Sequence, residues 1–196
     1  DLICGTALGA NIRDYTFFSY RPEEALHISL REKQVILELL DKINQELQRC
    51  IDCYSQKIIS KYIELLLDYC ERFYERQFIT RNEANKQIIG RFNRLLDHHF
   101  HTIQSQSADL PTIEDCAGSL HLSPAYFNDL LEYETGKSFK EYLQFKRFET
   151  AKDWLINTDK PLNQIAQELG FRNAQYFSRL FKKMTGCPPN DFRMPN

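Results

Sequence analysis

The C-terminal half of the chain contains one amphipathic pattern twice, at 113–136 and at 162–186. Each copy has a short run with an alanine behind an apolar residue, then a turn, then a longer amphipathic run that ends in Thr-Gly. Ala117 and Ala166 are 49 residues apart, whereas Thr135 and Thr185 are 50 apart, so the second copy has one extra residue in its turn. Repeats this similar indicate one supersecondary unit used twice, a helix-turn-helix unit.

The residue types at the turn explain the spacing. A small residue is needed where the two helices cross, and Ala117 and Ala166 provide it. The turn needs a backbone position that tolerates positive φ, which Gly170 supplies at no steric cost and which His121 occupies in the first copy. Ser123-Pro124 is typical of a helix start. We expect the second helices to bury Phe127 and Leu130 in the first copy, and Phe177 and Leu180 in the second, and to end at Thr135-Gly136 and Thr185-Gly186.

The most distinctive residues lie within the second copy and just after it: Ile165-Ala166, Leu169-Gly170-Phe171, 176–183, Thr185-Gly186 and 189–193. With these residues, the region from about Ala84 to the end resembles the DNA-binding domain of the AraC/XylS-type bacterial transcription regulators. The resemblance implies an all-α domain at 84–196 with seven helices: a leading helix, two helix-turn-helix units joined by a long helix, and a short last helix. It also implies that 1–83 is a helical linker and dimerisation segment.

The N-terminal part is predicted to be a pair of amphipathic helices. Ser29 and Glu32 form a capping-box pattern, and apolar periodicity continues to about Lys57. A second helix is expected at about 56–78, with more apolar surface than one partner helix can cover. That surface either packs within the chain or forms a homodimer through residues 29–78. The run 15–20 is β-leaning, and it is either a remnant strand of an upstream sensing domain or a segment packed on the helices.

Composition excludes several classes of protein. The net charge of −2 argues against unspecific binding of nucleic acid. No stretch is long and apolar enough to span a membrane, and no signal peptide pattern opens the chain, so we expect a cytoplasmic protein. Because the sequence does not begin with Met, we also expect it to be a fragment of a longer protein. The six cysteines are expected to be reduced thiols, with Cys50 and Cys53 on a helix. No motif predicts catalytic residues, a cofactor or a metal site, so we do not expect an enzyme.

Charge and residue type predict how each unit meets double-stranded DNA. From Lys160 to the chain end there are six basic and two acidic residues, a net charge of +4. The stretch 109–135 has six acidic residues and no basic one, a net charge of −6. In the second unit, the predicted DNA-binding residues are Arg172, Asn173, Gln175, Tyr176, Ser178, Arg179, Lys182 and Lys183. In the first unit, they are Ser123, Ala125, Tyr126, Asn128 and Asp129, all expected to be exposed. Arginine pairs with guanine and Asn or Gln with adenine, whereas the lysines suit phosphates.

The helix expected at 138–158 joins the two units. Some 20 residues of helix span roughly 30 Å, close to the roughly 34 Å between successive major grooves. The basic residues Lys137, Lys140, Lys146 and Arg147 are expected to touch the DNA backbone. The main hypothesis is a sequence-specific regulator with two recognition helices in successive major grooves, and the alternative is a protein-interaction module that no longer binds DNA. RNA polymerase is a candidate partner for the acidic surface, and a small-molecule effector is expected only with an upstream sensing domain.

Overall fold

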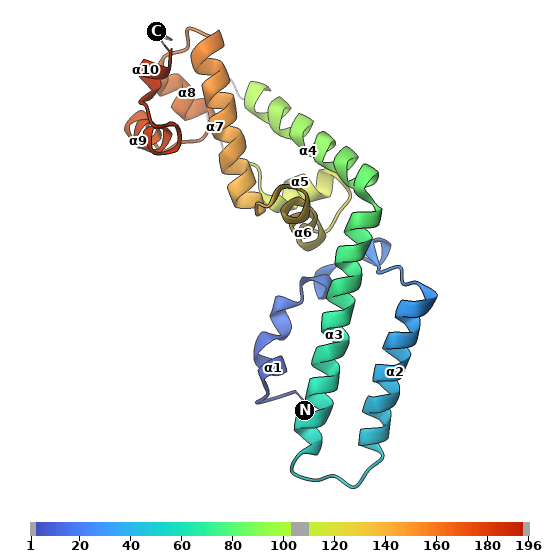
Figure 1. The fold of residues 1–196 in the computed structure, drawn as a ribbon. Helices are drawn as coiled ribbons and strands as arrows, with labels where there is room; N and C mark the ends of the chain where they lie inside the picture. Colours follow the sequence, from blue (N-terminus) through green and yellow to red (C-terminus); the bar gives the residue numbers. More distant parts are fainter. Residues whose placement is uncertain (1–2, 103–109, 194–196) are drawn as a thin grey trace. The chain divides into compact units, whose positions relative to one another are not determined.

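The computed structural model describes residues 3–102 and 110–193, and it divides into two compact units (Figure 1). The first unit comprises 1–85 together with Ala125–Phe127, and the second comprises 86–124 and 128–196. Within the described ranges, all regular structure is helical, which confirms the all-α class. None of the described helices is long and apolar enough to cross a lipid bilayer.

The first unit is built on two long helices, α2 (Leu30–Leu47) and α3 (Ser55–Thr80). The predicted capping box opens α2: the Ser29 hydroxyl accepts from the Glu32 amide at 3.3 Å, and the Glu32 carboxylate accepts from the Ser29 amide at 2.7 Å. Arg76 of α3 donates to the same carboxylate at 2.9 Å. One glutamate therefore both starts α2 and ties it to α3. The shorter N-terminal elements are α1 (Ala7–Asn11), η1 (Ile12–Asp14), η2 (Thr16–Ser19) and η3 (Pro22–Glu24).

The β-leaning run at 15–20 is not a strand. It forms the 3₁₀ turn η2, with local hydrogen bonds from Phe18 to Tyr15 and from Tyr20 to Phe17. The Phe17 ring stacks on Tyr74 of α3 with centroids 5.5 Å apart, and the Tyr20 ring meets Tyr74 edge-on at 5.1 Å. Packing of these half-buried rings on a helix favours the turn, because an isolated strand would leave its backbone groups without partners.

The prediction that the first helix continues from 29 to about 57 is also wrong, because the helix ends earlier. α2 stops at Leu47, and 48–54 connects it to α3, so Cys50 and Cys53 lie in this connection and not on a helix. α2 has Gln48 as its C-cap residue. Further along, the Asp52 carboxylate accepts from the amides of Tyr54 at 2.8 Å and Ser55 at 2.9 Å, and a short polar side chain that bonds nearby backbone in this way favours the start of the next helix.

The second unit contains the seven helices that the resemblance implies, counted over the described residues. They are α4 (Asn82–Thr102, whose first four residues belong to the first unit), α5 (Ile113–Ser119), α6 (Pro124–Thr135, of which Ala125–Phe127 belong to the first unit), α7 (Phe139–Asn157), α8 (Leu162–Glu168), α9 (Ala174–Thr185) and α10 (Pro189–Arg193). Its core consists of aromatic and aliphatic side chains that are almost fully buried: Phe92, Leu96, Phe100, Leu130, Leu131, Leu155, Ile165, Leu169, Phe177 and Phe181.

Candidate nucleic-acid interface

The two helix-turn-helix turns have the same hydrogen bonds. In α5–α6 the Leu122 amide donates to the Ala117 carbonyl at 2.9 Å, and in α8–α9 the Phe171 amide donates to the Ala166 carbonyl at 2.8 Å. This bond spans the residue with positive φ, as in the Schellman motif that ends many helices. That residue is His121 in the first turn, with φ of 61°, and Gly170 in the second, with φ of 68°. The predicted conformation of both turns is therefore confirmed.

The second recognition helix, α9, has one buried face and one exposed face. Phe177 and Phe181 are fully buried, and both pack near the ring of Phe148 on α7. Leu180, which was expected on the buried face, is only half-buried, because Phe181 occupies the core position. The exposed side chains are Arg172, Asn173, Gln175, Tyr176, Arg179, Lys182 and Lys183, as predicted, and Ser178 is half-buried. Because Phe177 and Phe181 are buried against α7, four basic side chains and two amide side chains are left exposed to solvent.

Arg179 and Tyr176 are associated on this exposed face. The guanidinium carbon of Arg179 lies 5.6 Å from the ring centroid of Tyr176, one helical turn before it. A cation over an aromatic ring at this distance is attracted by the ring, which limits the directions that the arginine samples. Gln175, one turn before Arg179, makes no hydrogen bond within the described part of the chain. Its amide is free to bind a base edge.

Asn173 and Asn128 have structural roles that the base-reading prediction missed. The Asn173 side-chain oxygen accepts from the Tyr176 amide at 2.7 Å and so caps α9. The Asn128 oxygen accepts from the Phe139 amide at 3.1 Å, at the start of α7. Two-point pairing with adenine needs both the oxygen and the nitrogen of the amide, so it would cost these bonds. The capping role of Asn173 could have been predicted from the repeat, since Asn173 aligns with Ser123, the predicted N-cap residue of the first copy.

The first recognition helix, α6, is less exposed than predicted. Ser123 is 3% exposed and Tyr126 is 4% exposed, so the prediction that both are on the surface is wrong. Tyr126 belongs to the first unit, where its ring lies 5.1 Å from that of Tyr20 and 5.4 Å from that of Phe78. Burial raises the pKa of its hydroxyl. Ala125, Asn128 and Asp129 are half-buried.

Arg147 of α7 was expected to touch DNA phosphates, but it is buried in the second unit. Its Nε donates to the Leu169 carbonyl at 2.7 Å, just before the turn glycine, and its guanidinium lies 3.8 Å from the centroid of Phe171. Burial lowers the pKa of Arg147 to about 10, which leaves it charged at neutral pH. Arg147 therefore holds the second turn on α7. No pattern in the sequence distinguishes it from Lys140, which is exposed, or from Lys146, which is half-buried.

Intramolecular contacts change the charge that the second unit presents. Lys160 pairs with the buried Glu168 at 2.5 Å and lies 4.0 Å over the Trp154 ring, so this pair is neutral toward a partner. In the first copy, Asp115 is the capping-box partner of Thr112, whose hydrogen bonds lower the pKa of the Asp115 carboxyl. Between residues 162 and 186, the cations without an ion pair therefore lie on α9 and on the turn before it. Within the described residues, no cluster of His, Cys, Asp or Glu side chains has the geometry to hold a metal ion.

Comparison with known proteins agrees with this geometry. A family model described as a helix-turn-helix domain matches residues 116–194. YtdP of Bacillus subtilis, an uncharacterized HTH-type transcriptional regulator, is 31% identical over 125 residues, which cover 63% of this chain and 16% of that protein. YijO of Escherichia coli, with the same description, is 25% identical over 186 residues, which cover 95% of this chain and 62% of that protein.

The arabinose operon regulatory protein of Escherichia coli is 35% identical over 135 residues, which cover 68% of this chain and 45% of that protein. The chain therefore spans less than two thirds of the length of each of these three relatives. The match to YijO, which covers 95% of this chain, takes in nearly all of the N-terminal helices together with the helix-turn-helix region.

Proposed function

We propose a function from one premise: the chain belongs to the AraC/XylS family of helix-turn-helix transcription regulators. The chain binds double-stranded DNA in a sequence-specific manner and regulates transcription in the bacterial cytoplasm. The three relatives are named as regulators, which supports action by binding rather than by catalysis.

The observation that carries the proposal is the exposed face of α9. Three cations, Arg179, Lys182 and Lys183, project from a helix whose other face is packed by Phe177 and Phe181, and Arg172 lies exposed in the turn before it. A helix of this kind fits the major groove, where arginine pairs with guanine and glutamine with adenine. In this proposal Arg179 and Gln175 contact bases, the two lysines contact phosphates, and Asn173 and Ser178 contact the backbone through their remaining donors.

The length of α7 supports binding in two successive major grooves. Its 19 residues correspond to about 28 Å of helix, against roughly 34 Å between grooves on one face of DNA. The contribution of α6 to affinity is expected to be small, because Tyr126 is buried and Glu132 is exposed near the groove-facing positions. Its remaining candidates for base contacts are Asp129 and the side-chain nitrogen of Asn128, whose oxygen accepts from the Phe139 amide. The acidic surface of this unit is a candidate contact for another protein, such as RNA polymerase.

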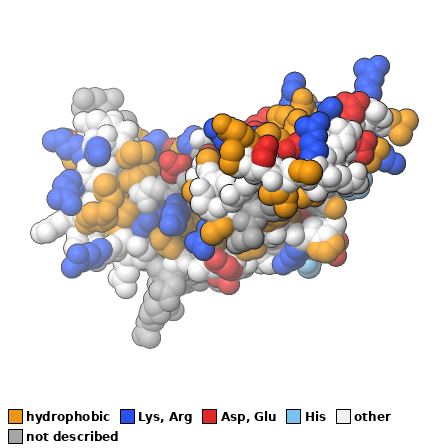
Figure 2. All heavy atoms as spheres, turned by 90° about the horizontal axis from the view of Figure 1, so that it is seen from below, with side chains coloured by type: hydrophobic (Ala, Val, Ile, Leu, Met, Phe, Trp, Pro, Cys, Tyr) orange, Lys and Arg blue, Asp and Glu red, His pale blue; other side chains and the backbone are white. Residues whose placement is uncertain are grey.

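The outer face of α2 supports a homodimer. Leu30, Leu37, Leu40 and Leu47 are exposed, and hydrophobic side chains reach the surface between charged ones in Figure 2. Positions 30, 37 and 44 form one heptad row and 33, 40 and 47 form another, with Lys33 and Asn44 as the polar residues. This spacing is that of a two-stranded coiled coil, in which a polar residue sets the register. Sedimentation equilibrium on the Leu37→Glu variant tests it: we expect a monomer, and a dimer of unchanged stability would contradict it.

The DNA-binding proposal is tested with duplexes selected from random sequence by the wild-type protein. Fluorescence anisotropy should then give saturable binding, and Arg179→Ala should cost about 1–3 kcal/mol of affinity and relax the preference at one base position. If no duplex is enriched at low salt, the alternative holds, in which the acidic first unit and the exposed α2 leucines make a protein-interaction module. An effector, if the longer protein senses one, would then act through an additional domain.

A further inference from the structure

The N-terminal segment and the start of α3 line a half-open cavity of about 360 Å³. Gly5, Thr6 and Ala7 form one wall, and Cys53, Gln56, Lys57, Ser60 and Lys61 form the other. This volume is in the range of sites that bind small metabolites. From the groups that line it, we propose that this cavity binds the phosphate or carboxylate group of a small organic anion, a function independent of DNA binding.

Ser60 is the first observation that points to a ligand. Its side chain is 4% exposed and lines the cavity, yet its hydroxyl has no hydrogen-bond partner in the described structure. The hydroxyl oxygen is not sealed from solvent, since Arg193 Nε is the only buried side-chain polar atom without a partner among the described residues. It is therefore open to an acceptor atom placed in the cavity. Serine hydroxyls in helices commonly bond the preceding turn, so the open donor of Ser60 is unusual.

The start of α3 supplies a second set of donors. Asp52 already accepts from the amides of Tyr54 and Ser55, and its carboxylate is engaged there. The next two amides of this 26-residue helix, those of Gln56 and Lys57, have no acceptor within the helix, and both residues line the cavity. Oxyanions bind at such positions because the free amides and the helix dipole favour negative charge.

Two lysines add positive charge to the same wall. Lys57 is exposed and forms no ion pair within the described residues, so its ammonium group is available to a ligand. Lys61 pairs with Glu64, one turn further along α3, and contributes less. The cavity therefore offers a cation, a hydroxyl and backbone amides around small side chains, which suits a compact anion.

The opposite wall is held in place by specific contacts. The Gln56 side chain donates to the Cys4 carbonyl at 3.1 Å, and the Thr6 hydroxyl accepts from the Gly9 amide at 3.2 Å. A Cβ atom at Gly9 would lie 2.2 Å from the Ile3 carbonyl oxygen, so only glycine permits this close turn. The N-terminal segment is thus fixed over the start of α3.

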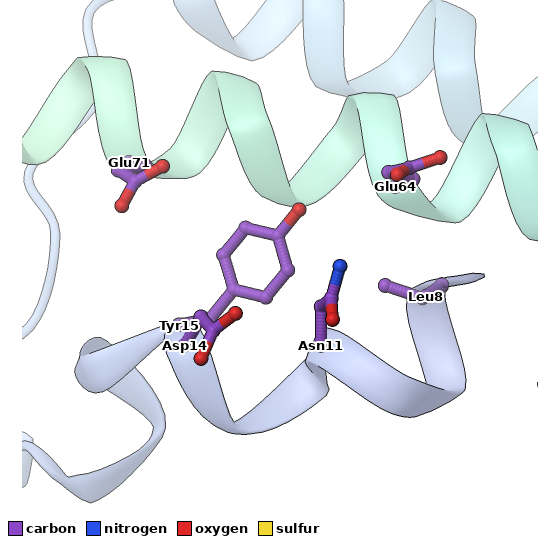
Figure 3. A pocket seen from close by; sticks show the side chains of 6 residues that line it. All are labelled: Leu8, Asn11, Asp14, Tyr15, Glu64 and Glu71. Carbon is purple, nitrogen blue, oxygen red and sulfur yellow. The ribbon is translucent and has the colours of Figure 1, made fainter.

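A neighbouring cavity in the same unit has the opposite character (Figure 3). It has a volume of about 200 Å³ and is lined by Leu8, Asn11, Asp14, Tyr15, Glu64 and Glu71. Tyr15 extends from the N-terminal segment toward α3, and its hydroxyl donates to Asp68 at 2.6 Å. Three carboxylates around this space would repel an anion, which restricts the proposed binding to the Lys57 cavity.

The test uses the full chain, labelled with ¹⁵N, and two probes: inorganic phosphate and acetate, each titrated at constant ionic strength without DNA. We expect a saturable shift of the amide signals of Gln56, Lys57 and Ser60 with at least one probe. Ser60→Ala and Lys57→Gln should each weaken binding by about fivefold or more, because each removes one direct contact. Lys42→Gln, which removes the same charge from the exposed side of α2, should leave binding unchanged.

Three results would overturn the proposal: no saturation with either probe, shifts spread over lysines throughout the chain, or equal affinities of the Lys57→Gln and Lys42→Gln variants. Because no DNA is present, such a failure would leave the proposed regulation of transcription untouched. Equally, a chain that binds no duplex could still bind the anion.

Discussion

Removal of two lysines from α9 gives a quantitative test of how this chain meets DNA. Lys182 and Lys183 are both exposed in the last turn of α9. Each phosphate neutralised contributes about −0.9 to the slope of log K against log salt concentration. For the Lys182→Ala/Lys183→Ala variant, the slope of log K against log salt concentration should therefore be less negative than in the wild type by about 1.8. Between 50 and 200 mM salt, a fourfold change, the loss of affinity should be about 12-fold smaller than in the wild type.

The assay is fluorescence anisotropy with a duplex selected by the wild-type protein, repeated at four or more salt concentrations. The control is Arg31→Ala/Lys42→Ala, which removes the same charge from exposed positions of α2. If α9 lies in the groove, only the lysine pair changes the slope, and it weakens binding to all duplexes alike. An unchanged slope in the α9 variant, or an equal change in the α2 control, would refute the placement of α9 on the phosphates.

Three further outcomes follow from individual contacts. Arg147→Met should destabilise the protein by about 1–3 kcal/mol in urea unfolding, because a buried carbonyl loses its donor, whereas Lys146→Met should be nearly neutral; equal effects would contradict the anchoring role. Asn173→Ala should cost about 1 kcal/mol through the lost cap of α9, and Asn173→Ser should restore most of it in the same assay. Burial of Glu32 raises its pKa, but hydrogen bonds from its own capping box and from Arg76 outweigh this and keep the pKa below its usual value. The resulting stability is present above the usual glutamate pKa and is lost as pH falls through the folded-state pKa. Between pH 5 and 3, the midpoint of thermal unfolding, followed by circular dichroism, should therefore fall less in Glu32→Gln than in the wild type.

The duplicated unit was predictable because its determinants are local. The positive φ at His121 and Gly170, the end of α9 at Gly186 and the capping box at Ser29 depend on residues within one or two turns of the chain. The exposed face of α9 followed from helical periodicity alone, since Phe177 and Phe181 lie on its opposite side. The cap at Asn173 was equally local, and alignment of the two copies would have identified it.

Other features depend on what distant segments bring to a residue. Tyr126 and Tyr176 occupy the same place in the two copies, one residue before the buried phenylalanine, yet Tyr126 is 4% exposed and Tyr176 is 41% exposed. The difference arises from Tyr20 and Phe78, which cover Tyr126 and which no pattern near it announces. Arg147 likewise gains its role only from a carbonyl 22 residues away. Short-range hydrogen bonds and periodicity can be inferred from neighbours in the chain, whereas burial is decided by the surfaces that folding brings against each side chain.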